Sequence, residues 1–378
     1  MSKFYCAAPW RGLHINFRGD VKTCCAGDPN MLGNLANQSI DQILQSPKMQ
    51  EIRASLQQGQ MHPEYCLNCI QAERYGRSER HWHNDVNQEF DVTQASLTEH
   101  QPTIVDIRWN TTCNLSCNYC GPSCSSQWAG IMKIAHTRGV KPYYEQVCDY
   151  IEQHQSSVKE VALVGGEPLL LKENERLLDV IPADCIVTLI TNMNVEFDRN
   201  AIVKKLTQRK RVGWSMSLDN ITARFEYVRS GGNWHLTNQN IQRVVDYMKT
   251  LGHWGGIHAV YNMYNCTHLC ELREYANAVG TTILWQTLYQ PDYLDPMLHS
   301  EQVRTLALAE LELYQQRYGF TEQEQQFFTA VQKNLKNPPN SNLLVASEFK
   351  QHILDIETKY HKQDLGRFQQ LWSEFNNV

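Results

Sequence analysis

The sequence predicts an α/β fold, preceded by a small cysteine-rich unit and followed by a helical region. Residues 104–290 contain six short apolar, β-branched runs with helical patterns between them. Strand–helix–strand repeats of this kind form right-handed units around a parallel sheet. The stretch 1–76 instead combines five cysteines with a hairpin pattern, and only helical patterns follow residue 291.

The first unit, residues 1–76, begins with a predicted β-hairpin. Polar and apolar residues alternate over 12–25 around a turn at Gly19. A helical pattern then begins at Ser39, which is a suitable N-cap residue. The unit ends with a C-x2-C pair, Cys66 and Cys69.

Four thiols of this unit are expected to converge. A hairpin can bring Cys6 near Cys24, and the C-x2-C pair adds two more ligands. Adjacent residues rarely both face one metal, so Cys25 is the alternative to Cys24. The spacing predicts a four-thiolate site and leaves both zinc and an iron–sulfur cluster open.

Residues 77–103 are polar and without sustained periodicity, so we expect a linker or a wrapping segment. His81 and His83 are interpreted as a solvated pair.

The central region, residues 104–290, is expected to place its ligands at the carboxyl ends of its strands. The expected strands are 104–109, 158–164, 185–190, 212–218, 255–261 and 282–288. The expected helices are 125–137, 143–154, 172–181, 199–208, 234–251 and 267–278. Residues 291–378 are expected to form further helices that close the sheet or bind a partner.

Three cysteines directly follow the first of these strands. Cys113, Cys117 and Cys120 have the spacing C-x3-C-x2-C. Thiolates are soft ligands that hold iron–sulfur clusters. Three protein ligands leave one iron of a cubane open, and an open metal position indicates catalysis rather than structure. A loop of buried thiols or a zinc knuckle is the alternative.

The octapeptide from Cys113 to Cys120 resembles the signature of the radical S-adenosylmethionine (radical SAM) enzymes. Val164-Gly165-Gly166-Glu167-Pro168 resembles the Gly-Gly-Glu that follows the second strand in that family. The resemblance implies a partial (β/α)6 TIM-like barrel. It also implies a 4Fe-4S cluster with one open iron, held by the three cysteines, and S-adenosylmethionine as a second cofactor.

The resemblance further implies which residues contact S-adenosylmethionine. Tyr119 would lie near the adenine, and the Gly-Gly-Glu segment would hold the methionyl amine. A serine and an arginine after the fourth strand would contact the ribose and the carboxylate; Ser217 and Arg229 are expected there, with Arg224 ranked after Arg229. The expected cofactor contacts are Tyr119, Gly165, Gly166, Glu167, Thr191, Asn192, Ser217 and Arg229. The Thr191-Asn192 pair departs from the family pattern because Met193 replaces the customary glycine.

The N-terminal cysteines resemble half of the motif of the SPASM and twitch auxiliary-cluster domains of this family. Residues 70–112 contain no further cysteine, which favours the shorter twitch type with one auxiliary cluster, expected to be 4Fe-4S. The implied ligands are Cys6, Cys24, Cys66 and Cys69. In the better-known members this domain follows the barrel, whereas here it precedes it.

Composition narrows the class of protein. The hydrophobic content is 42% and the charged content 20%, as in ordinary globular proteins. No signal-peptide core and no membrane-spanning run is visible, so we expect a cytoplasmic protein with reduced thiols. The net charge of −5 argues against electrostatic binding of long nucleic acid.

The family resemblance implies that the protein reductively cleaves S-adenosylmethionine and abstracts hydrogen from a peptide or protein. The alternative substrates are a small metabolite, a sugar or a nucleotide. A non-catalytic metal-binding protein is the remote alternative. A reductant such as flavodoxin or ferredoxin is the implied partner, and no catalytic acid or base is identified.

Overall fold

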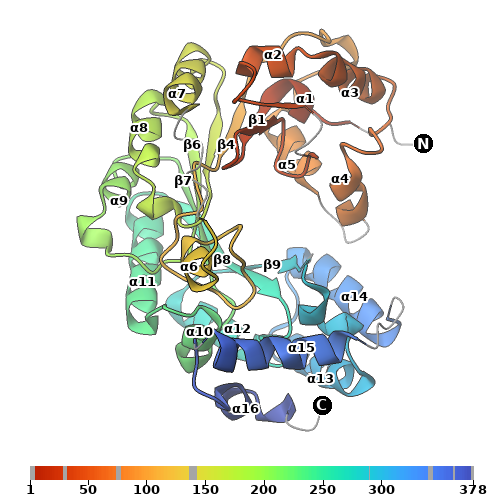
Figure 1. The fold of residues 1–378 in the computed structure, drawn as a ribbon, viewed down its shortest axis with the longest axis vertical. Helices are drawn as coiled ribbons and strands as arrows, with labels where there is room; N and C mark the ends of the chain where they lie inside the picture. The colour runs from red at the N-terminus through yellow and green to blue at the C-terminus, as the bar shows by residue number, and fades with distance from the viewer. Residues whose placement is uncertain are drawn as a thin grey trace.

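A nine-stranded sheet forms the centre of the computed structural model (Figure 1). The structure describes residues 5–28, 32–73, 78–135, 143–288, 290–338, 344–360 and 362–375. The strand order is β3-β2-β1-β4-β5-β6-β7-β8-β9. The strands are β1 Gly12–Ile15, β2 Asp20–Lys22, β3 Gly33–Asn34, β4 Ile104–Ile107, β5 Glu160–Leu163, β6 Ile186–Thr191, β7 Val212–Ser217, β8 Trp254–Tyr261 and β9 Ile283–Thr287. All six strands expected between residues 104 and 290 are present, and they pair in parallel.

The N-terminal hairpin is part of the same sheet. β1 and β2 pair antiparallel, as the alternating pattern predicted, and the turn contains Gly19 at φ +84°. β1 also pairs in parallel with β4, with Gly12 opposite Ile104. The cysteine-rich unit is therefore attached to the barrel strands by backbone hydrogen bonds, which the local sequence pattern did not indicate.

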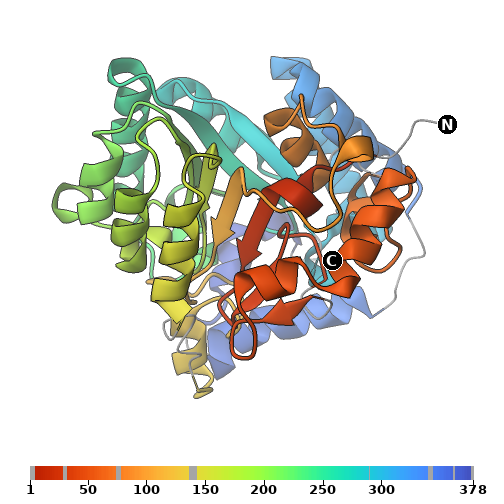
Figure 2. The same cartoon turned by 90° about the horizontal axis from the view of Figure 1, so that it is seen from above.

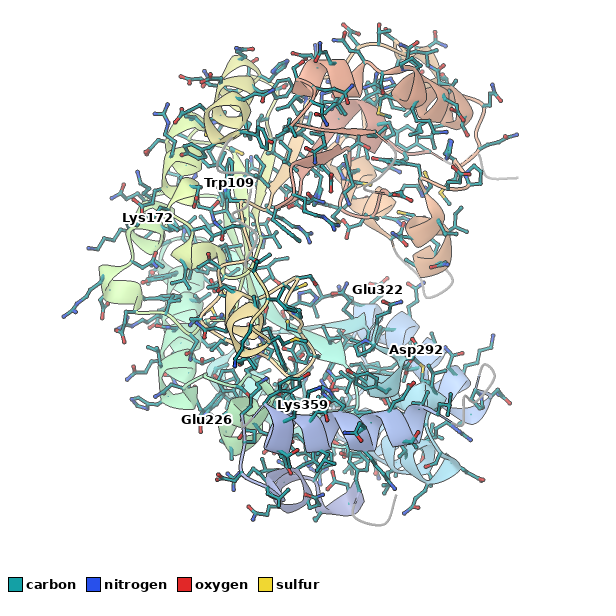
Figure 3. The ribbon with its side chains drawn as sticks, in the orientation of Figure 1. Trp109, Lys172, Glu226, Asp292, Glu322 and Lys359 are labelled. Carbon is teal, nitrogen blue, oxygen red and sulfur yellow. The ribbon has the colours of Figure 1, made fainter. Side chains whose placement is uncertain are left out.

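Helices cover the sheet on one side (Figure 1). They are α7 Tyr144–Gln153, α8 Glu173–Val180, α9 Ala201–Leu206 and α11 Trp234–Thr250. Alternation along β6 explains the arrangement, because Val187 and Leu189 are fully buried while Thr188 and Ile190 are partly exposed on the opposite face. Trp109, labelled in Figure 3, follows β4 and packs between these layers. Its indole donates to Oδ1 of Asn174 at 2.8 Å.

The N-terminal unit and the C-terminal helices lie on the other side of the sheet (Figure 2). The N-terminal helices are α1 Ala8–Arg11, α2 Ile40–Leu44, α3 Pro47–Gln57, α4 Leu67–Ala72 and α5 Glu79–Val86. Ser39 caps α2 in a capping box, as predicted. Helix α5 lies in the segment for which no helix was expected.

The C-terminal region is helical, as expected. Its main helices are α13 Glu301–Tyr318, α14 Glu322–Lys336, α15 Val345–Leu354 and α16 Arg367–Leu371, whereas α12 Leu269–Val279 lies between β8 and β9 in the central region. A π-helical turn, Asp355–Lys359, follows α15. Trp372 is fully buried against Tyr227 and Tyr264, so this region packs on the carboxyl end of the sheet. Among the described residues, no helix combines the length and the apolar character needed to cross a membrane.

Candidate active site

The loop with Cys113, Cys117 and Cys120 begins at the carboxyl end of β4 and is held from two sides. Helix α6, Ser126–Ile131, contributes Trp128, whose indole donates to the carbonyl oxygen of Cys117 at 2.8 Å. From the other side, the backbone N–H of Asn118 donates to the carbonyl oxygen of Val228 at 2.7 Å. The structure brings all three thiols together, with Cys113 and Cys117 buried and Cys120 half-buried.

The electrostatics of the three thiols differ. The Cys120 thiol donates to Cys117 and lowers the pKa of Cys117 to about 7, with Arg229 and Lys362 adding to this effect. Burial raises the pKa of Cys113 to about 12. Two cationic side chains therefore face the loop, which suits an anionic group held by thiolates.

Glu167 joins the ends of two strands. Its carboxylate accepts hydrogen bonds from Oγ1 of Thr191 at 2.8 Å and from the backbone N–H of Asn192 at 2.7 Å. The backbone N–H of Leu169 donates to it as well, at 3.1 Å. Burial raises the pKa of Glu167 to about 7. The protein's own hydrogen bonds thus occupy the Glu167 carboxylate. The part of the Gly-Gly-Glu segment that can still bind a ligand is its exposed backbone.

The same segment lies against the chain that leads into the cysteine loop. The backbone N–H of Glu167 donates to the carbonyl oxygen of Thr112 at 2.8 Å. A Cβ on Gly166 would lie 2.2 Å from that oxygen, so only glycine fits there. Asn192 extends the contact because its amide donates to Oδ1 of Asn114 at 2.9 Å and to Sγ of Cys113 at 3.8 Å. The residues expected after β5 and β6 therefore meet at the three-cysteine loop.

Tyr119 and Arg229 share one buried carboxylate. The Tyr119 hydroxyl donates to Oδ2 of Asp219 at 2.6 Å, and Arg229 pairs with the same oxygen at 2.8 Å. Arg224 instead pairs with Glu271 and donates to the carbonyl oxygen of Leu371. Arg229 is thus beside the loop, while Arg224 belongs to the C-terminal packing. Asp219 was not among the expected site residues, although it lies two positions after the end of β7.

Ser217 ends β7 on the partly exposed face and pairs in register with His258 of β8. Ser215 lies on the same face, and its hydroxyl is 3.1 Å from Nδ1 of His258. The face of the sheet that carries Ser215, Ser217 and His258 is called the inner face below. It lies between the strand ends and the N-terminal unit.

A second group of thiols lines a cavity in the N-terminal unit. The cavity is bounded by Cys6, Cys24, Cys66 and Cys69, with Tyr65, Met61, Arg80 and His83 among the other walls. Burial raises the pKa of all four thiols, to about 12 for Cys6 and about 11 for Cys66. Within the described residues, no group of three His, Cys, Asp or Glu side chains is arranged as one metal ion requires. Four thiols that line one cavity are a ligand set for an iron–sulfur cluster, and also for a structural zinc ion.

Cys25 lies apart from this cavity. Its thiol hydrogen-bonds Glu79 of α5 and faces Asp106 and Arg108. Of the two alternatives in the sequence, only Cys24 faces the other three cysteines.

Charged side chains of β1 and of the end of β4 meet on the inner face. Nδ1 of His14 is 2.9 Å from Asp106, and Arg108 is 3.3 Å from the same carboxyl oxygen. Burial would raise the pKa of Asp106, but His14 and Arg108 outweigh it and hold that pKa well below its usual value. His83, expected as solvated, is buried beside them, with 2% of its surface exposed. That expectation was wrong because helix α5 turns His83 toward the hairpin.

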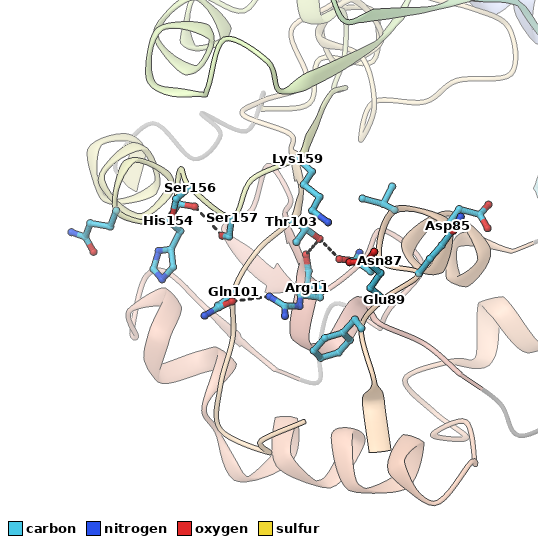
Figure 4. Close-up of a pocket in the computed structure, with 14 residues that line it drawn as sticks. Arg11, Asp85, Asn87, Glu89, Gln101, Thr103, His154, Ser156, Ser157 and Lys159 are labelled. Carbon is cyan, nitrogen blue, oxygen red and sulfur yellow. Dashed lines mark hydrogen bonds between the residues drawn. The ribbon is translucent and has the colours of Figure 1, made fainter. Parts of the chain in front are cut away.

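A cavity of about 890 Å³ lies at the opposite end of the parallel strands (Figure 4). Arg11, Thr103 and Lys159 line it, and each directly precedes a strand. It is therefore at the amino ends of the strands, away from the thiols.

Two stretches of the chain, each of which contains one of the thiol groups, match protein-family models. Residues 107–268 match the model of the radical SAM superfamily. The chain carries a radical SAM domain. Residues 6–70 match SPASM, an iron–sulfur cluster-binding domain. A radical SAM domain binds a 4Fe-4S cluster and S-adenosylmethionine, a SPASM domain binds auxiliary iron–sulfur clusters, and proteins of this superfamily are enzymes.

Individual proteins similar to this chain cover only parts of it. A 7-carboxy-7-deazaguanine synthase of Clostridium acetobutylicum is 32% identical over 91 residues, which are 24% of this chain and 34% of that protein. The chain thus spans about a third of the curated relative it matches. Among solved structures, Streptococcus suis SuiB bound to S-adenosylmethionine has a TM-score of 0.42 at 16% identity, covering 71% of this chain and 64% of SuiB. Native anSMEcpe with bound AdoMet has a TM-score of 0.41 at 16% identity, covering 57% and 60% of the two chains.

Proposed function

We propose that the protein is a radical SAM enzyme that abstracts hydrogen from a carbon of a peptide or protein substrate. The observation that supports this most strongly is the meeting of three thiols with the Gly-Gly-Glu segment at the carboxyl ends of parallel strands. When bound, the cluster and S-adenosylmethionine supply an electron and a 5′-deoxyadenosyl radical, which takes the hydrogen.

The chain's own residues have separate roles in this proposal. Cys113, Cys117 and Cys120 hold the first cluster. Backbone groups of Gly165 and Gly166 would receive the methionyl amine, with Thr191 and Asn192 held nearby by Glu167. Tyr119 would contact the adenine, and Arg229, fixed by Asp219, would attract the cofactor carboxylate. Ser217, at the end of β7, would contact the ribose.

We further propose that Cys6, Cys24, Cys66 and Cys69 hold the auxiliary cluster. Four protein ligands saturate it, so its role is electron transfer rather than direct binding of the substrate. The inner face between the two sites, with Arg108 and Asp106, would then hold the substrate.

A peptide or protein substrate is favoured because radical SAM enzymes that modify peptides often carry a domain of the SPASM type. The second candidate is a small metabolite. It is favoured by the 32% identity over 91 residues to a synthase of a deazaguanine.

Anaerobic reconstitution tests the proposal. Wild type should hold about eight irons per chain and form 5′-deoxyadenosine from S-adenosylmethionine and dithionite. The triple variant Cys113→Ala, Cys117→Ala, Cys120→Ala should hold about four irons and form none. Cys124→Ala is the matched control, because Cys124 is exposed four residues after Cys120. A wild-type protein with iron but without cleavage would refute the enzymatic function.

A further inference from the structure

The chain that follows α15 crosses the three-cysteine loop. After the π-helical turn, the ring of Tyr360 meets the ring of Trp128 edge-on, with 5.1 Å between their centres. Figure 3 places Lys359 between the C-terminal helices and the segment that holds α6. Further along, the Gln363 amide donates to Oγ of Ser230 at 3.1 Å. The C-terminal region is therefore in direct contact with the elements that support the loop.

Lys362 reaches into the loop itself. Its ammonium donates to the carbonyl oxygen of Ser116 and, at 2.9 Å, to Oδ1 of Asn118. It also lies 3.9 Å from the centre of the Trp128 ring. Ser116 and Asn118 flank Cys117, and Trp128 donates to the Cys117 carbonyl. All three partners of this one side chain therefore surround the middle cysteine.

These contacts leave the charge of Lys362 without a carboxylate partner among the described residues. Its partners are two uncharged oxygens and an aromatic ring. Burial lowers the pKa of Lys362 to about 7, and the negative charges of Cys117 and Cys120 oppose this shift and favour the charged ammonium. A cation in a poorly solvated position acts on nearby charge much more strongly than one in water.

We propose that Lys362 is a positioning residue through which the C-terminal region both fixes the three-cysteine loop and raises the reduction potential of the cluster held there. Reduction adds one negative charge to the cluster, and a nearby positive charge stabilises that reduced form. This inference rests on the proposed function only in taking the loop as the site of the first cluster. It adds a role for residue 362, which lies beyond the matched range 107–268.

The test is a redox titration of the reconstituted full-length protein, followed through the spin-resonance signal that changes when S-adenosylmethionine is added. Lys362→Gln keeps N–H donors for the loop but removes the charge, and Lys362→Arg keeps the charge. Lys359→Met is the matched control, since it removes an ammonium three residues earlier whose side chain is 62% exposed.

The first cluster of Lys362→Gln should be harder to reduce. At a fixed potential its ratio of reduced to oxidised cluster should fall about tenfold, which corresponds to about 59 mV. Lys362→Arg and Lys359→Met should keep the wild-type ratio. A Lys362→Gln protein with a full iron count and an unchanged ratio would overturn the inference.

Two further results keep the inference separate from the proposed function. If Lys362→Gln cannot assemble the first cluster, then Lys362→Arg must assemble it and keep the wild-type ratio of reduced to oxidised cluster. Loss of the cluster in both variants would also overturn the inference. The ratio is measured without turnover, so wild type that fails to cleave S-adenosylmethionine refutes the proposed function without deciding the role of Lys362.

Discussion

The two thiol sites of this protein contrast in charge and in closure. The three-cysteine loop faces two cations, Arg229 and Lys362, and lies next to exposed backbone of the Gly-Gly-Glu segment. The four-thiol cavity is bounded mainly by apolar or uncharged side chains, with the cation of Arg80 among its walls. Burial raises the pKa of every thiol there and that of Cys113 in the loop, whereas the pKa of Cys117 is lowered. The comparison teaches that the loop combines its thiols with cations and exposed backbone that can meet a charged ligand, whereas the walls of the four-thiol cavity are mostly uncharged.

The largest difference between the two sites should appear in 5′-deoxyadenosine formation when one thiol is removed from each site in turn. Cys117→Ala should reduce 5′-deoxyadenosine formation to background, because it removes a ligand of the open cluster. Cys69→Ala should keep this cleavage within roughly tenfold of wild type while stopping substrate turnover. The measurement is anaerobic product analysis with and without substrate. Equal loss of cleavage in both variants would contradict the division of roles.

Cys24 and Cys25 are neighbours that the structure places in different surroundings. Cys24→Ala should lower the iron content from about eight to about four per chain. Cys25→Ala should keep about eight, because its thiol hydrogen-bonds Glu79 outside the cavity. Iron and acid-labile sulfide analysis after reconstitution measures both. If Cys25→Ala lost iron and Cys24→Ala did not, Cys25 rather than Cys24 would be the cluster ligand.

The strands could be predicted from the sequence because each is a short run rich in apolar and β-branched residues between helical patterns. Ile104–Ile107 and Val212–Ser217 begin at the residues where the pattern placed them. The cysteine spacing likewise identified three thiols that the fold brings together. Only local regularities of this kind are visible in a single sequence.

Contacts between distant segments could not be predicted. The pairing of Gly12 with Ile104 joins the hairpin to the barrel, and no local pattern records such a partner. Helix α5 was missed because its polar side chains, such as His83, become buried only against the hairpin. Lys362 was missed for the same reason, since its partners lie about 245 positions earlier in the chain.

The next largest difference should separate Arg229 from Arg224, the two arginines that the sequence ranked, in both stability and cofactor binding. Arg229→Met leaves Asp219 buried without its cation and should cost roughly 3 to 5 kcal/mol of unfolding free energy. It should also weaken S-adenosylmethionine binding. Arg224→Met breaks a partly exposed pair with Glu271 and should cost about 1 kcal/mol or less from the ion pair, without weakening cofactor binding. Denaturant unfolding of the apo-protein and cofactor titration of the reconstituted protein test the ranking, which would be wrong if Arg224→Met weakened binding as much.

The most gradual effect should come from the protonation of Glu167. Its pKa is about 7 in the folded protein against 4.5 for the ordinary group, so folding favours the protonated form. This contribution is fully present below pH 4.5 and is lost as the pH rises through 7. The loss should amount to about 1 to 3 kcal/mol of unfolding free energy. Glu167→Gln cannot titrate, so the difference in stability between wild type and this variant should depend on pH across that window. Urea unfolding of both apo-proteins from pH 5 to 7.5 measures the difference, and parallel curves would show that burial does not raise the pKa of Glu167.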